Sequence, residues 1–200
     1  MIPERQISGW IAHIGRINSA LDWLSVCDNK GNELEVDIAL EMWKNLTLQI
    51  RDARQTVFLM GNGASASMAS HVSADLAKNA HVRTEVFSDL SLITAIANDL
   101  GYEEVFAEPL RRRISKDDMV VAISSSGQSP NILKACLEAI KLQGRVVTLS
   151  AMKPDNPLRY LGMFNFYVPA EIYGLAETCH TAILHYWIDL VSGENARYGL

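Results

Sequence analysis

The chain has 200 residues, of which 48% are hydrophobic, and this length and composition suit one α/β domain with a substantial core. Its formal net charge of −5 provides no global positive field, so nucleic acid is not an expected ligand. A small anion remains compatible with this charge, because a few local N–H groups and hydroxyls suffice to hold a phosphate.

The sequence carries no sign of export or of a membrane span. No segment has the roughly 18 uncharged apolar residues that a span needs, and Glu4 and Arg5 stand where a signal peptide would have its basic start and apolar stretch. Cys27, Cys136 and Cys179 are widely spaced and odd in number, unlike a disulfide framework or a zinc ribbon. We therefore expect free thiols in a cytoplasmic protein without a membrane partner.

Helical patterns occupy the first quarter of the chain. From residue 5 to about residue 25, apolar residues recur at three- and four-residue steps, which predicts an amphipathic helix. The turn-forming residues 28–32 should end it, and a second helical pattern runs over 36–50. We expect residues 1–54 to form a helical extension that packs on the next domain and within a homo-oligomer, because its large apolar side chains need a partner surface.

From residue 56 onward, short apolar runs alternate with helical segments, which predicts a parallel sheet covered on both faces. The predicted strands are 56–60, 83–87, 119–123, 145–149 and 164–168, and the predicted helices are 66–79, 91–99, 103–113, 130–142 and 176–191. The expected fold of residues 55–200 is therefore α/β, with a three-layer, doubly wound, flavodoxin-like sheet of about five parallel strands.

Two predicted strands run into loops rich in glycine and serine that lead directly into helices, at 61–67 and 124–131. Ligands of open parallel sheets bind beyond the carboxyl ends of the strands, where helix N-termini offer free N–H groups and the positive end of the helix dipole. One such loop alone would be an ordinary polar turn with a serine N-cap. The pair predicts an anion site, and neither loop has the Lys of a P-loop or the third Gly of a dinucleotide fingerprint.

Histidines and one carboxylate follow these loops. His71 and Asp75 are four residues apart, so they share one face of the helix after the first loop and could bind one metal ion. His180 and His185 are five residues apart, about 140° around an ideal helix. Only one of these two is expected to be a ligand.

These motifs, taken together, resemble the phosphoheptose isomerase family of sugar isomerase (SIS) domains. The resemblance rests on residues 61–65 followed by His71, on 95–102, on 123–131, and on His180 with His185, in the family's order and over roughly residues 35 to 191. It implies an SIS fold, a homotetramer with active sites at subunit contacts, and bound zinc. It also implies an isomerase that converts sedoheptulose 7-phosphate to D-glycero-D-manno-heptose 7-phosphate.

The resemblance further implies roles for individual residues. The implied substrate contacts are Asn62, Gly63, Ser65, Asp99, Ser124, Ser125, Ser126, Ser129 and Glu177. The implied metal ligands are His71, Asp75, Glu177 and His185, of which Asp75 and His185 are also the implied catalytic groups. On the same grounds, His180 is expected to be a packing or supporting residue.

Aldose–ketose isomerisation through an enediol needs a group that takes a proton from carbon, a group that serves the oxygens, and stabilisation of developing negative charge. The family's catalytic Glu falls on Asp75, its Gln ligand on Glu177, and a substrate-contacting Asp on Gly174. On one straight helix, Glu177 and His185 would be about 12 Å apart, so a shared metal requires Glu177 at or before the helix start. The donor set suits zinc and also accepts other first-row divalent ions.

An alternative function fits the same loops: a non-catalytic SIS-domain regulator or assembly protein that binds a sugar phosphate. The substitutions in the implied metal shell favour this alternative, and with Gly174 they also leave open an isomerase that acts on another ketose or aldose phosphate. The presence of His71 and His185, with carboxylates at 75 and 177, favours the enzyme.

Overall fold

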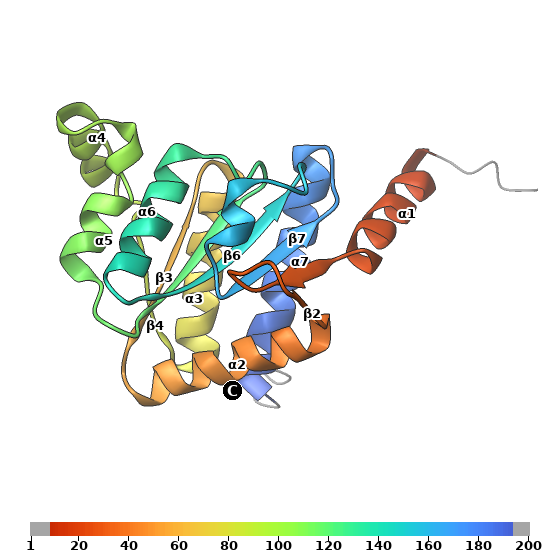
Figure 1. Cartoon of the computed structure of the whole chain (residues 1–200), viewed down its shortest axis with the longest axis horizontal. Helices are drawn as coiled ribbons and strands as arrows, with labels where there is room; N and C mark the ends of the chain where they lie inside the picture. The colour runs from red at the N-terminus through yellow and green to blue at the C-terminus, as the bar shows by residue number, and fades with distance from the viewer. Residues whose placement is uncertain (1–8, 194–200) are drawn as a thin grey trace, which may run out of the picture.

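The structure, a computed structural model that describes residues 9–193, is built on a 7-stranded sheet in the order β2-β1-β7-β6-β5-β3-β4 (Figure 1). Five consecutive strands of this sheet, in the order β7-β6-β5-β3-β4, are parallel to one another. These five are β3 (Thr56–Gly61), β4 (Arg83–Val86), β5 (Met119–Ser124), β6 (Arg145–Ala151) and β7 (Phe164–Val168). All five predicted strands are present, and the predicted α/β fold is confirmed.

Two further strands, β1 (Ser25–Cys27) and β2 (Glu33–Leu34), extend the sheet as an antiparallel hairpin that sequence patterns did not predict. The hairpin turn is closed by Asp28, whose Oδ1 accepts hydrogen bonds from the backbone N–H of Lys30 at 2.8 Å and of Asn32 at 2.9 Å. β1 pairs with β7. Part of the predicted N-terminal extension therefore belongs to the sheet, and the division at residue 54 stays a prediction.

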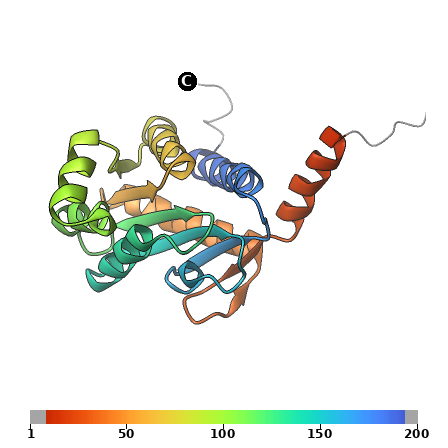
Figure 2. The same ribbon diagram turned by 90° about the horizontal axis from the view of Figure 1, so that it is seen from above.

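Alternate residues of the central strands feed two separate apolar cores. Val57 and Leu59 face the core under α2 (Val36–Asp52), α3 (Ala64–Ala80) and α7 (Tyr173–Ser192). Phe58 and Met60 face the opposite core, which is covered by α5 (Ala107–Arg113) and α6 (Pro130–Lys141). Seen from above, α3 and α7 lie on one side of the sheet and α6 on the other (Figure 2). This alternation is the two-residue period of a strand.

The predicted helices are present, with one interruption. α4 (Leu90–Asp99) matches its prediction, whereas the helix expected over 103–113 divides into a 3₁₀ turn, η1 (Tyr102–Glu104), and α5. Pro109 explains the break, because it has no N–H to donate to the carbonyl of Val105. A second 3₁₀ turn, η2 (Pro157–Tyr160), precedes β7.

α1 (Gly9–Asp22) projects from the body of the molecule in both views, although it contacts α7 and buries Ala20 (Figures 1 and 2). The predicted helix start at residue 5 lies outside the described residues. Trp10 on α1 is 67% exposed, and Ile11 and Ile14 are exposed beside it. Packing of this helix within a homo-oligomer stays a prediction.

The three cysteines are buried and unpaired, which confirms the expected free thiols. Among residues 9–193, no helix combines the length and the apolar character needed to cross a membrane.

The topology creates a crevice at one point of the sheet. β3 and β5 are neighbours, yet the helix that follows β3 packs on one face and the helix that follows β5 on the other. The two Ser/Gly loops leave adjacent strand ends in opposite directions, and ligands bind at such switch points.

Candidate functional site

A cavity of ≈ 150 Å³ opens where the two loops diverge, and we call it the serine cavity. It is lined by Asn62, Ser65, Ile123, Ser124, Ser125, Ser126, Ser129, Tyr173 and Glu177. Six of the predicted substrate contacts in the two loops, together with Glu177, thus come together at one place.

Two helix N-termini meet at this cavity. α3 begins after Gly63 and α6 begins after Ser129, and neither N-cap residue forms a side-chain hydrogen bond to its helix. The first N–H groups of a helix and the positive end of its dipole favour an anion. The two helix N-termini therefore contribute positive potential to a cavity whose lining also includes the acidic Glu177.

Buried hydroxyl groups add hydrogen-bonding capacity. Ser65, Ser124 and Ser125 are each 5% exposed. Ser124 Oγ and Ser129 Oγ lie 3.2 Å apart, whereas the Oγ of Ser125 has no partner among the described residues. A buried polar group without a partner costs about 1–3 kcal/mol, and an oxyanion in the cavity would remove that cost.

Gly127 allows the second loop to close against the chain behind it. Its φ is 61°, and a Cβ at this position would lie 1.9 Å from Oδ1 of Asn156. Asn156 is 1% exposed, and its Nδ2 donates to the carbonyl oxygens of Lys153 at 2.8 Å and Ala151 at 3.3 Å. The loop is thus supported by a buried amide about thirty residues away in sequence, which sequence patterns did not identify.

A second group of polar side chains, the His–Asp cluster, comprises His71, Asp75 and His185. One donor atom from each lies within 4.8 Å of the other two. His71 Nε2 is 3.4 Å from Asp75 Oδ2, and the rings of His71 and His185 have centroids 5.2 Å apart. The predicted sharing of one helix face by His71 and Asp75 is thus realised, and α7 supplies His185.

The His–Asp cluster fits a divalent metal by its donor chemistry. Imidazole nitrogens and carboxylate oxygens are donor types that zinc accepts in proteins. A site with three such protein donors leaves a position open for water or substrate. His71 is exposed, while Asp75 and His185 are half-buried, so a ligand can approach from solvent.

The structure does not bring Glu177 into the His–Asp cluster. α7 begins at Tyr173, so Glu177 lies inside the helix, eight residues before His185 and about 12 Å away along the axis. The condition for a shared metal, Glu177 at or before the helix start, is not met in this chain. Glu177 instead lines the serine cavity.

Two other predicted substrate contacts lie outside the lining of the serine cavity. Asp99 is the last residue of α4, where its Oδ1 accepts a hydrogen bond from Asn98 at 2.8 Å. Gly63 borders a neighbouring, mainly apolar pocket of ≈ 220 Å³ that also contacts Asn62 and Tyr102.

His180 is fully buried, and its Nε2 lies 3.1 Å from the carbonyl oxygen of Ser150. Burial lowers the pKa of His180 to about 4, so the ring is neutral near pH 7. This position agrees with the packing or supporting role expected for His180.

The serine cavity and the His–Asp cluster lie along the same seam between α3 and α7. Ser65 and His71 are six residues apart on α3, about 9 Å along its axis. Between the two groups, Thr181 of α7 donates a hydrogen bond to the sulfur of Met68 of α3 at 2.9 Å. An anion site and a metal-type site are therefore joined by one helix–helix contact.

Three further residues at or beside the cavity were not predicted from the sequence: Asn131, Tyr102 and Tyr173. Tyr173 lines the serine cavity, and Asn131 and Tyr102 bond to Asn62. Asn131 and Tyr102 lie within the motifs used for the resemblance, but their partner is distant in sequence, so no local pattern indicates the contact.

The chain is also similar to known proteins in sequence and in fold. A family model described as SIS domain matches residues 23–151. A phosphoheptose isomerase from Helicobacter pylori is 31% identical over 159 residues, which cover 76% of this chain and 82% of that protein. One from Citrifermentans bemidjiense is 30% identical over 167 residues, covering 80% of this chain and 86% of that protein.

A solved phosphoheptose isomerase structure from Francisella tularensis matches with a TM-score of 0.78 and 22% identity, over 91% of this chain and 93% of that chain. At that identity the likeness shows the fold. Together with the sequence matches, the two Ser/Gly loops and the His–Asp cluster, it leads to one assignment: the chain belongs to the phosphoheptose isomerase family of SIS-domain proteins.

Proposed function

We propose that this protein is a metal-assisted aldose–ketose isomerase that converts sedoheptulose 7-phosphate to D-glycero-D-manno-heptose 7-phosphate. The observation that carries the proposal is the position of the serine cavity and the His–Asp cluster on the seam between α3 and α7. An isomerase of this kind must hold the phosphate at one end of its substrate while proton transfer takes place at the other.

The separation along this seam agrees with the length of a seven-carbon substrate. Ser65 and His71 are about 9 Å apart along the axis of α3, and Glu177 and His185 are about 12 Å apart along the axis of α7. An open-chain heptose 7-phosphate has eight single bonds between its first carbon and its phosphorus, and it spans roughly 10 Å if each bond advances roughly 1.25 Å. A triose phosphate, with four such bonds, is too short to occupy both ends.

In this proposal the serine hydroxyls and the two helix N-termini bind the phosphate, and Glu177 accepts hydrogen bonds from sugar hydroxyls. The carboxylate of Asp75 takes the proton from carbon, and His185 serves the adjacent oxygens as the enediol forms and collapses. A divalent cation held by His71, Asp75 and His185, zinc by preference of the donor set, would supply electrostatic stabilisation of the developing negative charge.

Several finer features of the family are part of the same proposal. The protein would assemble as a homotetramer in the cytoplasm. Gly63 and Asp99 would contact the substrate from outside the lining of the serine cavity, and Glu177 would support the metal shell indirectly, through the substrate. The exposed apolar residues of α1 are consistent with assembly.

The second candidate is a non-catalytic sugar-phosphate-binding protein. It requires the serine cavity and makes no use of the His–Asp cluster. The close approach of two imidazoles and a carboxylate from two different helices favours the isomerase over this candidate.

The test is turnover of sedoheptulose 7-phosphate by purified protein, followed by the same assay with His185→Ala. We expect kcat to fall about 10²- to 10⁴-fold, the usual contribution of a positioned acid or base, with little change in affinity for inorganic phosphate. The control is His81→Asn at an exposed position with φ 55°, which asparagine tolerates. Full activity of His185→Ala would refute the assigned role.

A further inference from the structure

Two asparagine side chains join the loops that form the serine cavity. Asn62 follows β3, and Asn131 stands at the second position of α6. Nδ2 of Asn62 donates to Oδ1 of Asn131 at 3.0 Å, and Nδ2 of Asn131 donates to Oδ1 of Asn62 at 2.9 Å. Asn131 is 2% exposed, so this reciprocal pair is shielded from competing water.

The direction of these hydrogen bonds is fixed by the backbone. The N–H of Ile132 points at Oδ1 of Asn131 at 3.0 Å, and an N–H group can only donate. The oxygen of Asn131 must therefore face Ile132, its nitrogen must donate to Asn62, and the oxygen of Asn62 must accept. Exchanging the oxygen and nitrogen positions of either amide would place one N–H donor against another.

Tyr102 completes the set of partners around Asn62. Its hydroxyl donates to Oδ1 of Asn62 at 3.2 Å. A carboxamide has two acceptor sites and two N–H donors. Tyr102 and Asn131 occupy both acceptor sites of Asn62, and Asn131 takes one donor, so one N–H of Asn62 has no acceptor within the described part of the chain.

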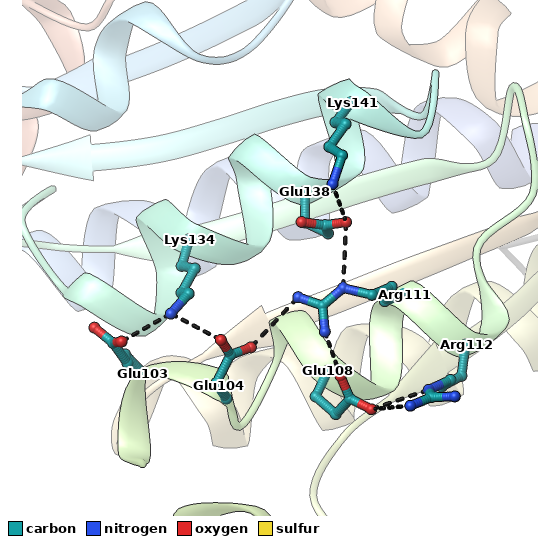
Figure 3. Close-up of polar contacts among 8 residues, drawn as sticks. All are labelled: Glu103, Glu104, Glu108, Arg111, Arg112, Lys134, Glu138 and Lys141. Atoms are coloured by element: carbon teal, nitrogen blue, oxygen red, sulfur yellow. Dashed lines mark hydrogen bonds and ion pairs between the residues drawn. The ribbon is translucent and has the colours of Figure 1, made fainter. Parts of the chain in front are cut away.

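The turn that carries Tyr102 is anchored to α6 by charge. Lys134, one helical turn after Asn131, places Nζ 2.7 Å from a carboxylate oxygen of Glu103 and 2.8 Å from one of Glu104 (Figure 3). Hydrogen bonds to these carboxylates raise the pKa of Lys134, so it stays charged. Arg111 continues the network from Glu104 to α5. α6 therefore contacts Asn62 directly and holds η1 beside it.

We propose that Tyr102 and Lys134 are positioning residues: Lys134 holds the 3₁₀ turn, and the hydroxyl of Tyr102 fixes the amide of Asn62 so that its remaining N–H donates to an oxyanion in the serine cavity. Asn62 lines that cavity together with the serines. The inference rests on the proposed function for the identity of the substrate. The prediction that the cavity binds a phosphate group does not depend on the proposed function.

The first test measures the dissociation constant of inorganic phosphate by titration calorimetry. Tyr102→Phe removes only a hydroxyl from a side chain that is 58% exposed, so the fold should persist. Loss of one neutral hydrogen bond predicts a rise in the dissociation constant of about 2- to 10-fold. The matched control is Tyr160→Phe, on η2 and 51% exposed, which should leave the constant unchanged.

The second test separates positioning from simple charge. Lys134→Met should weaken phosphate binding, whereas Lys141→Met, on the same helix and paired with Glu138 rather than with η1, removes the same charge and should not. The double variant Lys134→Met with Tyr102→Phe should bind phosphate as Tyr102→Phe does. Because both changes act through one contact, their effects should not add.

The outcomes distinguish this inference from the proposed function. With sedoheptulose 7-phosphate, Tyr102→Phe should raise KM and leave kcat unchanged, the signature of lost uniform binding. Unchanged phosphate binding in both Tyr102→Phe and Lys134→Met, or additive effects in the double variant, would overturn the inference and leave the isomerase intact. A wild-type protein that binds phosphate and converts no sugar phosphate would overturn the isomerase, while the phosphate titrations still decide the positioning role. A wild-type protein that binds no phosphate would overturn both.

Discussion

Substitution of Gly127 by alanine should destabilise the fold far more than its size suggests. The backbone there has φ 61°, and the new Cβ would lie 1.9 Å from Oδ1 of Asn156. The left-handed backbone alone costs about 1–2 kcal/mol for an L-residue. Moving the side chain of Asn156 would break its three side-chain hydrogen bonds, to Ser150 Oγ and to the carbonyl oxygens of Ala151 and Lys153. At about 0.5–1.5 kcal/mol for each bond, the total cost, with the backbone, is about 2.5–6.5 kcal/mol.

The assay is denaturant unfolding of Gly127→Ala beside Gly63→Ala. Gly63 also has positive φ, 55°, but a Cβ there would meet nothing within 4 Å, so only a backbone cost of about 1–3 kcal/mol is expected. Adding Asn156→Ala to Gly127→Ala should relieve the overlap, so the double variant should lose less stability than the sum of the single losses. Equal losses for the two glycine variants, together with additivity in the double variant, would refute this reasoning.

Three further predictions concern His180, the serine cavity and the His–Asp cluster. The pKa of His180 is about 4 in the folded chain, against an ordinary value of 6.5, so the unfolded chain binds this proton first as the pH falls. Wild-type stability should therefore decrease by about 3 kcal/mol from pH 6.5 to pH 4. Urea unfolding of His180→Leu should show a smaller loss of stability over this range, and equal losses would refute the assignment. Ser125→Ala should weaken phosphate binding without loss of thermal stability, because the Ser125 hydroxyl lacks a partner among the described residues. The control, Ser192→Ala, removes another buried hydroxyl without a partner there, outside the cavity lining, and should leave phosphate binding unchanged. Equal phosphate binding in the two variants would contradict the serine cavity as the phosphate site. Asp75→Asn should lower the zinc retained after dialysis, measured by mass spectrometry, whereas Asp99→Asn should match wild type; equal zinc contents would remove Asp75 from the metal shell.

The five parallel strands and the two loops could be predicted because their signals are local. A buried parallel strand is a short apolar run, and a Gly/Ser loop between such a run and a helix marks a strand end. The pairing of His71 with Asp75 could also be predicted, since residues four apart lie on the same face of a helix. These features need no knowledge of distant contacts.

Other features depend on contacts that no local pattern carries. β1 and β2 have three and two residues, too few for a period to be visible, and they exist because β7 offers a free edge. The bonds of Asn62 with Asn131 and Tyr102 join residues 69 and 40 positions apart. Whether Glu177 lies inside α7 or before it depends on where this helix begins. The sequence around Gly174 did not determine that position, and the helix begins at Tyr173.

Proton transfer on a sugar phosphate can be followed by incubating zinc-loaded protein with sedoheptulose 7-phosphate in deuterated water and observing the carbons by NMR. The account predicts an aldoheptose 7-phosphate product, with solvent deuterium entering only at the carbons that exchange the proton. It also predicts that removal of the metal or His185→Ala suppresses product formation and exchange. Binding of the sugar phosphate with neither product nor deuterium incorporation would contradict the account and identify a binding protein instead.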